Sequence, residues 1–250
     1  MDIRALLFDV NGTLIDIETD EGLEEIYRAI AHFLTYQGIS MRRGEVRDLY
    51  FQLMQQQRET SKETHAEWNA VEVWREMLQR NASDYTRSLP PEKLQQLPLF
   101  LAELHRGIAR KRLRLYPQVR EILDQLHPYY PMAIVTDAQS AYAVPELYAV
   151  GLLGYFNPVI ISGDYGYRKP DIQLFQKALD ALQVEPQQAL FIGNDMHRDI
   201  FGPQQLNMKT IFISSNQGEK YYPGVQPHYI INNFAELPQA INFFVTQQGE

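Results

Sequence analysis

The chain has 250 residues, 45% of them hydrophobic, so it can bury a substantial core in one large domain or two smaller ones. The 23 lysine and arginine residues are outnumbered by 31 acidic ones, and a net charge of −8 leaves no basic footprint for nucleic acid. The absence of cysteine excludes disulfides and thiolate catalysis, and without a signal-peptide pattern or a membrane-spanning stretch we expect a cytoplasmic protein with no membrane partner.

The short apolar run 3–8 predicts a buried strand, and Asp9 follows it directly. The next turn signal is Asn11-Gly12, and ligands of open α/β sheets bind beyond the carboxyl ends of the strands, so Asp9 is expected in an active site. A carboxylate there can attack phosphorus, and its other oxygen can help bind Mg²⁺. Gly12 lets the backbone approach a phosphate closely. The alternative is a strand followed by an ordinary polar turn.

Residues 20–108 carry apolar side chains at helical spacing in four segments, and no strand signal is recognised between Asp16 and about Leu115. The pattern predicts a helical bundle inserted after the first strand. The basic run 110–114 is expected to be a solvated helix end, because lysine and arginine favour helix C-termini. We therefore expect a helical cap over residues 17–115 and a core built from residues 1–16 and 116–250.

Strands alternate with helices from residue 116 onward. Apolar runs predict strands at 132–135, 159–161, 189–192, 210–213 and 229–231. This alternation predicts an α/β fold with a doubly wound parallel sheet, a Rossmann-like core that carries the inserted helical cap.

Polar groups follow two of these predicted strands. Thr136 and Asp137 end the strand at 132–135, where a hydroxyl and the N–H groups of a following helix can hold a phosphate. Asn194 and Asp195 follow the strand at 189–192, and their oxygens suit a hard cation opposite Asp9. For both pairs the alternative is a helix N-cap.

The other polar residues near these positions are harder to place. Lys169, in a loop before Pro170, can neutralise phosphate oxygens if it points inward, and otherwise is an exposed lysine. Asp199 is expected to orient its loop. His197 and Arg198 are expected on the surface, because the helix that they open would point them outward.

Together, and in this order, Asp9, Thr136, Lys169 and the pair Asn194 and Asp195 resemble the four-motif pattern of the haloacid dehalogenase-like hydrolase superfamily. The resemblance covers essentially the whole chain and is to the branch with a helical cap after the first motif. It implies that Asp9 is the nucleophile and that the cap is a lid that excludes water when closed.

The resemblance also implies the remaining roles. The expected catalytic residues are Asp9, Asn11 and Lys169, and the expected substrate contacts are Asn11, Gly12, Thr136, Asp137 and Lys169. The expected Mg²⁺ ligands are Asp9, the main-chain carbonyl of Asn11, and a side chain after Gly193, which leaves Asn194 and Asp195 as alternatives.

Two positions depart from the family pattern. Phosphatases of the family carry Asp two residues after the nucleophile, where it protonates the leaving oxygen, but this chain has Asn11. An amide cannot exchange a proton in this way, and such general acid–base help is worth about 10²–10⁴-fold in rate. The residue after Gly193 is usually Asp and here is Asn194.

The sequence thus predicts a Mg²⁺-dependent phosphohydrolase that acts on a small phosphorylated metabolite through an aspartyl-phosphate, with Asn11 in the acid's place. Two alternatives stay open. A dehalogenase of the same superfamily tolerates Asn11, because halide leaves without a proton. A binding or regulatory protein on a degenerate enzyme fold would account for both Asn11 and Asn194. The sequence around Lys169 and the loop after Gly193 favour the phosphatase branch.

Overall fold

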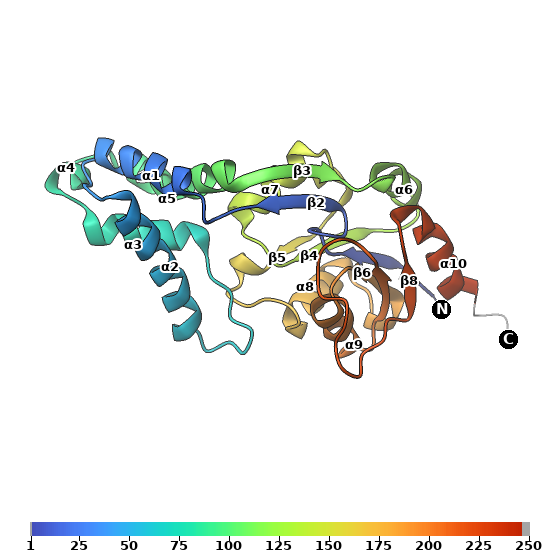
Figure 1. The fold of residues 1–250 in the computed structure, drawn as a ribbon. Coiled ribbons are helices and arrows are strands. Elements are labelled where there is room, and N and C mark those ends of the chain that lie inside the picture. Colours follow the sequence, from blue (N-terminus) through green and yellow to red (C-terminus); the bar gives the residue numbers. More distant parts are fainter. Residues whose placement is uncertain (1, 247–250) are drawn as a thin grey trace.

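The apolar runs form a six-stranded parallel sheet with the strand order β5-β4-β1-β6-β7-β8 (Figure 1). The structure, a computed structural model, describes residues 2–246. The strands are β1 (Ala5–Phe8), β4 (Met132–Thr136), β5 (Val159–Ile161), β6 (Ala189–Gly193), β7 (Lys209–Ile213) and β8 (Tyr229–Ile231). Every residue of β1, β4 and β6 is buried, as expected for parallel strands covered on both faces. The predicted fold class is confirmed.

Alternate residues of β1 face opposite layers of helices. Leu6 and Phe8 belong to the core beneath α6 (Val119–Leu126), α7 (Ser140–Ala149) and α10 (Leu237–Thr246). Ala5 and Leu7 pack on the other face with α8 (Ile172–Leu182). Shorter turns complete this part: α9 (Gly202–Gln204), a π-helix over Met196–Phe201, and 3₁₀ turns at Leu153–Tyr155, Ser162–Asp164, Pro186–Gln188 and Phe234–Glu236.

A second hydrophobic core lies among the helices between β1 and β4. The helices are α1 (Glu24–Tyr36), α2 (Arg43–Thr60), α3 (Ala70–Asn81), α4 (Asp84–Arg87) and α5 (Pro91–Ala109), and they form one end of the molecule (Figure 1). All six strands of the central sheet come from outside this helical region. The division of the chain into a core and a cap, with its boundaries at residues 16 and 116, stays a prediction.

Two strands connect the helical region to the sheet. β2 (Ile15–Thr19) and β3 (Arg110–Leu115) pair antiparallel and lie side by side in Figure 1. The expectation of a strand-free stretch from Asp16 to Leu115 was therefore wrong, as was the interpretation of 110–114 as a helix end. The basic residues are held in β3 by acidic partners on β2: Arg112 and Arg114 contact the Asp16 carboxylate at 2.9 and 2.7 Å.

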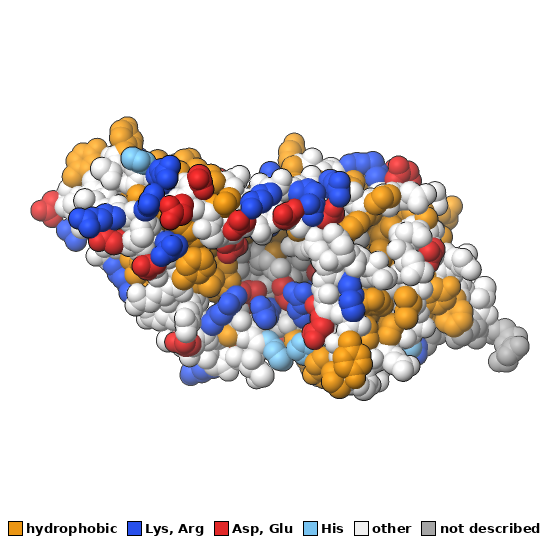
Figure 2. All heavy atoms as spheres, viewed as in Figure 1, with side chains coloured by type: hydrophobic (Ala, Val, Ile, Leu, Met, Phe, Trp, Pro, Cys, Tyr) orange, Lys and Arg blue, Asp and Glu red, His pale blue; other side chains and the backbone are white. Residues whose placement is uncertain are grey.

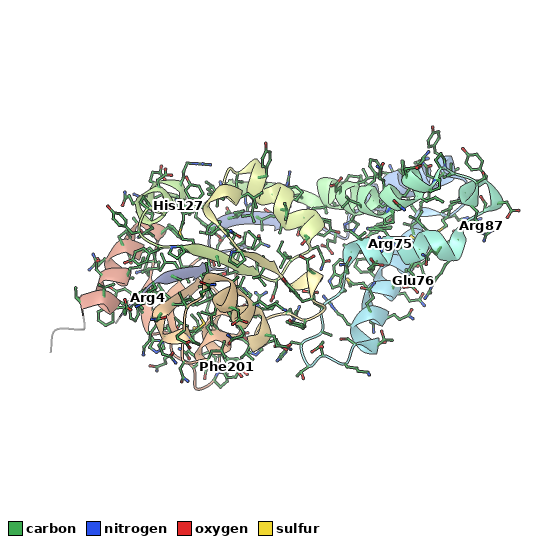
Figure 3. The ribbon with its side chains drawn as sticks, turned by 180° about the vertical axis from the view of Figure 1, so that it is seen from behind. Arg4, Arg75, Glu76, Arg87, His127 and Phe201 are labelled. Atoms are coloured by element: carbon green, nitrogen blue, oxygen red, sulfur yellow. The ribbon has the colours of Figure 1, made fainter. Side chains whose placement is uncertain are left out.

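The outer surface carries ordinary ion pairs, and the notable hollow lies between the two ends of the molecule. Figure 2 shows this hollow bordered by basic, acidic and histidine side chains. Figure 3 shows Arg75 and Arg87 on the helical region and Arg4 at the sheet end. Exposed pairs of this kind contribute about 0–1 kcal/mol and do not mark a site. No helix within residues 2–246 is long and apolar enough to cross a membrane; a cytoplasmic location stays a prediction.

Candidate active site

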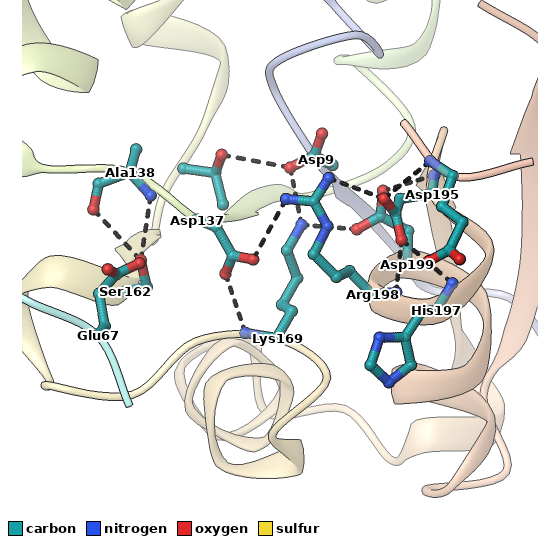
Figure 4. A network of polar contacts seen from close by, with 12 residues as sticks. Asp9, Glu67, Asp137, Ala138, Ser162, Lys169, Asp195, His197, Arg198 and Asp199 are labelled. Atoms are coloured by element: carbon teal, nitrogen blue, oxygen red, sulfur yellow. Dashed lines mark hydrogen bonds and ion pairs between the residues drawn. The ribbon is translucent and has the colours of Figure 1, made fainter. Parts of the chain in front are cut away.

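Asp9 lies buried at the carboxyl end of β1, where it is held through one oxygen. Its Oδ1 accepts hydrogen bonds from Lys169 Nζ at 2.7 Å and from Thr136 Oγ1 at 3.2 Å (Figure 4). The Thr136 hydroxyl is within reach because β4 runs parallel to β1 and ends beside it. Among residues 2–246, the other oxygen, Oδ2, has only a 3.4 Å contact with the Thr13 hydroxyl. The structure therefore brings three of the predicted site residues together and leaves one carboxylate oxygen of Asp9 nearly free.

Lys169 points inward and lies among carboxylates. Its Nζ donates to Asp199 Oδ1 at 2.6 Å as well as to Asp9, and its backbone N–H donates to Asp137 Oδ1 at 2.9 Å. Burial works to lower the pKa of Lys169, but the charges of Asp199, Asp9 and Asp137 outweigh it and raise that pKa above its usual value. Lys169 therefore stays protonated. Asp137 positions the Lys169 backbone, and its expected contact with the substrate stays a prediction.

Asp199 is a buried residue of the site, and the sequence did not reveal that it pairs with Lys169. Its Oδ1 pairs with Lys169, and its Oδ2 accepts the backbone N–H groups of Asn194 at 3.0 Å and Asp195 at 3.1 Å. Burial raises the pKa of this carboxyl, against the attraction of Lys169. Asp199 thus joins the lysine to the loop after β6. The signal in the sequence was weak: an acidic residue four positions after Asp195, next to an apolar Ile200.

The Asn194 side chain lies next to Asp9 and packs against Gly12. Its Oδ1 is 3.1 Å from the Thr13 hydroxyl, whose single proton can go either to Asn194 or to Asp9. Its Nδ2 is buried without a hydrogen-bond partner among residues 2–246. A Cβ on Gly12, where φ is +86°, would stand 2.2 Å from this Nδ2. Glycine is therefore required here to admit the amide, a reason that the sequence did not reveal.

Asp195 is occupied by donors of its own loop. Its Oδ1 accepts the N–H groups of His197 and Arg198, and its Oδ2 accepts from Arg198 Nη2 at 2.8 Å and from the N–H of Glu219 at 3.0 Å. Burial alone would raise the pKa of Asp195, but the hydrogen bonds from Arg198 lower it to about 2. Asp195 is therefore a helix N-cap, which was the alternative interpretation. It follows the end of β6, at the same edge of the sheet as Asp9.

Arg198 is partly exposed, but its side chain does not point outward as expected. The turn after Asp195 is a π-helix over Met196–Phe201, a wider turn than the α-helix that the expectation assumed. It directs the Arg198 guanidinium back toward Asp195 and Asp137 (Figure 4). His197 is half-buried and stacks on Tyr222, with ring centroids 4.4 Å apart.

The oxygen atoms that could bind a metal belong to a carboxylate, a main-chain carbonyl and a side-chain amide. No cluster of three or more His, Asp or Glu side chains suited to a metal ion occurs among residues 2–246. Within the same residues, neither the side chain nor the carbonyl of Asn11 makes a hydrogen bond. One oxygen of Asp9, the Asn11 carbonyl and the Asn194 amide are therefore available as oxygen ligands.

The sequence of the chain is similar to those of known proteins. A family model described as haloacid dehalogenase-like hydrolase matches residues 3–207. The chain is 33% identical to glyceraldehyde 3-phosphate phosphatase of Pyrococcus abyssi (strain GE5 / Orsay) over 102 residues, which cover 40% of this chain and 43% of that protein. It is 26% identical to pyrophosphatase PpaX of Bacillus cereus (strain G9842) over 95% of both proteins.

Solved structures share the fold. The 2-haloacid dehalogenase from Pseudomonas syringae pv. Tomato DC3000 superposes with a TM-score of 0.67 over 97% of this chain and 99% of that one, at 21% identity. At this identity the likeness concerns the fold alone. The family match extends over most of the chain and includes Asp9, Thr136, Lys169 and the loop after β6. The chain belongs to the haloacid dehalogenase-like hydrolases.

Proposed function

We propose that the chain is a Mg²⁺-dependent phosphohydrolase that acts on a small phosphorylated metabolite through an aspartyl-phosphate at Asp9. The observation that carries this proposal is the pairing of Asp9 Oδ1 with Lys169 Nζ at 2.7 Å and Thr136 Oγ1 at 3.2 Å at the end of β1. Phosphoryl transfer depends mainly on positioning and charge stabilisation, and a buried carboxylate flanked by an ammonium and a hydroxyl supplies both. Relatives named as phosphatases support the same activity.

The reaction follows from the groups around Asp9. An oxygen of Asp9 attacks phosphorus and the bond to the leaving oxygen breaks; because Asn11 has no proton to give, that oxygen leaves as an anion or takes a proton from water. Water then attacks the aspartyl-phosphate, which releases phosphate and restores the carboxylate. Lys169 and Thr136 stay beside the transferring group through both steps and stabilise its charge. Loss of one such preorganised donor typically costs about 10²–10³-fold in turnover.

The residues at this site fit Mg²⁺. The fit rests on the nearly free Oδ2 of Asp9, the Asn11 carbonyl, and Asn194 Oδ1, which accepts one hydrogen bond from Thr13 and keeps a second lone pair. All three offer hard oxygen atoms, and Mg²⁺ usually takes one or two carboxylates and keeps several waters. Asn194 rather than Asp195 is the proposed ligand, because both oxygens of Asp195 already accept N–H groups. When bound, the ion would supply positive charge to the phosphoryl oxygens.

Asn11 restricts this activity to substrates whose leaving oxygen needs little help. It occupies the position of the family's general acid but carries no proton that it can exchange. Acyl phosphates and other good leaving groups depend least on such an acid. The proposed substrates are therefore small phosphorylated metabolites that include activated phosphates.

The helical region is the proposed lid. Its loop between α2 and α3 lies against the segment that leads to Lys169: the N–H of Arg168 donates to the His65 carbonyl at 2.8 Å. The N–H of Glu67 donates to the Gly166 carbonyl at 2.9 Å, and Ser162 Oγ donates to Glu67 Oε2 at 3.0 Å. Closure over the site would exclude water from the first step.

The test is a screen of phosphorylated metabolites with and without Mg²⁺, using wild type and Asp9→Asn. We expect hydrolysis of some substrates that requires Mg²⁺ and is abolished by Asp9→Asn. The dehalogenase alternative is favoured by Asn11 and is tested with a 2-chloro acid: halide release that a chelator does not affect would support it. A folded protein with no activity in either assay would support the binding-protein alternative.

A further inference from the structure

Arg198 brings a second cation to the site, and it is more accessible than the first. Its side chain is 38% exposed, whereas that of Lys169 is 2% exposed. The π-helix over Met196–Phe201 places it there. Such turns are rare and occur frequently at functional sites, because they change the direction in which side chains leave the helix. Arg198 is therefore accessible to a ligand that approaches the carboxyl ends of β1 and β6.

The Arg198 guanidinium lies between two carboxylates that flank the catalytic residues. Its Nη2 is 2.8 Å from Asp195 Oδ2, and its Nη1 is 3.7 Å from Asp137 Oδ2. Asp137 directly follows Thr136, and its other oxygen accepts the N–H of Lys169. Figure 4 shows the guanidinium projecting toward this group of residues. Arg198 is thus held next to the strand ends where Asp9, Thr136 and Lys169 meet.

Donor counting shows which cation is free to bind a ligand. The ammonium of Lys169 has three N–H donors, and two of them already serve Asp9 and Asp199. The guanidinium of Arg198 has five, of which one donates to Asp195. Its contact with Asp137 is too long for a hydrogen bond, and Asp137 Oδ2 has no hydrogen-bond partner within residues 2–246. Arg198 can therefore turn from Asp137 to a ligand without breaking a hydrogen bond.

We propose that Arg198 is a phosphate-binding residue whose guanidinium binds two non-bridging oxygens of the phosphoryl group, next to Lys169. A guanidinium presents parallel N–H groups that match two oxygens of a phosphate, which an ammonium cannot do. This inference rests on the proposed function and narrows its ligand to a phosphoryl group with at least two free oxygens. The remaining contact with Asp195 would keep the side chain in place.

The test is equilibrium binding of inorganic phosphate to the full chain in Mg²⁺ buffer, measured by isothermal titration calorimetry. Arg198→Met should weaken phosphate binding about 10-fold or more. Arg198→Lys keeps the positive charge but not the parallel N–H groups, and should weaken phosphate binding less. The matched control is Arg87→Met, which removes the same charge at the outer end of the helical region (Figure 3) and should bind phosphate as wild type does. If Arg198→Met does not fold, the phosphate affinity of Arg198→Lys alone tests the proposal.

Four outcomes would overturn the proposal. Phosphate binding by Arg198→Met and Arg198→Lys at wild-type strength would remove Arg198 from the phosphate site, and so would wild type that binds no phosphate. A parallel loss of Mg²⁺ affinity, titrated without phosphate, would show that Arg198 only organises its loop. Lactate, a small carboxylate without a phosphoryl group, is the comparison ligand. If Arg198→Met loses lactate binding but keeps phosphate binding, Arg198 binds the carboxylate of a ligand and not a phosphoryl group. Because phosphate binding needs no turnover, these results are separate from a failure of the proposed hydrolysis.

Discussion

Replacing Asn11 with Asp should restore the missing proton donor. The side chain of Asn11 is half-buried and makes no hydrogen bond within residues 2–246, so the swap breaks no contact of the folded chain. The repulsion between the added carboxylate and the carboxylates of the site should therefore set the change, and without Mg²⁺ we expect the free energy of unfolding to fall by about 1 kcal/mol. A carboxyl at this position can protonate the leaving oxygen, which is worth about 10²–10⁴-fold, or about 3–5 kcal/mol of the barrier.

The gain should depend on the leaving group. For an alkyl phosphate such as glycerol 1-phosphate, kcat at saturating Mg²⁺ should rise about 10²-fold or more, whereas for p-nitrophenyl phosphate it should change little. The added negative charge near Asp9 should also attract Mg²⁺ more strongly and so lower the Mg²⁺ concentration needed for activity. Asn11→Ala is the control, because it removes the amide without adding a carboxyl. Equal rates for wild type and Asn11→Asp on both substrates would show that position 11 is not beside the leaving oxygen.

Three further predictions follow from the contacts of the site. Lys169→Met leaves the carboxylates of Asp9 and Asp199 buried without their cation. It should lower the free energy of unfolding, measured in urea, by about 3–5 kcal/mol. An unchanged free energy of unfolding would refute the buried pairing. Gly12→Ala forces a methyl group onto Asn194 at φ +86° and should cost about 1–3 kcal/mol, whereas Gly44→Ala, which meets no atom within 4 Å, should be neutral or stabilising. The pKa of Asp195 is lowered from 3.8 to about 2 in the folded state, so its contribution of up to about 2 kcal/mol is present above pH 4 and lost as the pH falls to 2. Thermal unfolding of wild type and Asp195→Asn over this range measures it, and parallel pH curves would contradict it.

The sheet was predictable from sequence because its strands are covered on both faces. Parallel strands such as β1 and β6 are continuous apolar runs, so their limits are visible in the sequence. The β2–β3 pair was missed because each strand is covered on one face only. In β3, Leu113 and Leu115 pack toward the core, while Arg112 and Arg114 reach across to β2. Alternation of apolar with charged residues was the available signal, and the dense positive charge obscured it.

At the candidate site, residues that directly follow strands were easier to predict than those placed by a turn. Asp9 and Thr136 meet because parallel neighbouring strands end together. The direction of Arg198 was misjudged because it belongs to a π-helix, whose side chains leave in other directions than the helical period of 3.6 residues assigns. Asp199 orients its loop as expected, but its pairing with Lys169 was missed. Nothing in the residue types marks that turn. The tertiary pairing of Asp199 with Lys169 stabilises it in the folded chain.

The charges of the site explain why two amides and an arginine occur together. The residues around Lys169 include four carboxyl groups and two cations, namely Asp9, Asp137, Asp195 and Asp199 against Lys169 and Arg198. This balance is negative, so an anionic substrate meets a site that repels it until a cation binds. A carboxylate at position 11 or 194 would add to that repulsion. Under the proposed function, the amides of Asn11 and Asn194 and the cation of Arg198 would let the site hold a phosphoryl group with a smaller contribution from the metal. In exchange, the site lacks a proton donor. Both Arg198→Met and Asn11→Asp should therefore bind phosphate more weakly than wild type. Turnover on alkyl phosphates should fall in Arg198→Met and rise in Asn11→Asp.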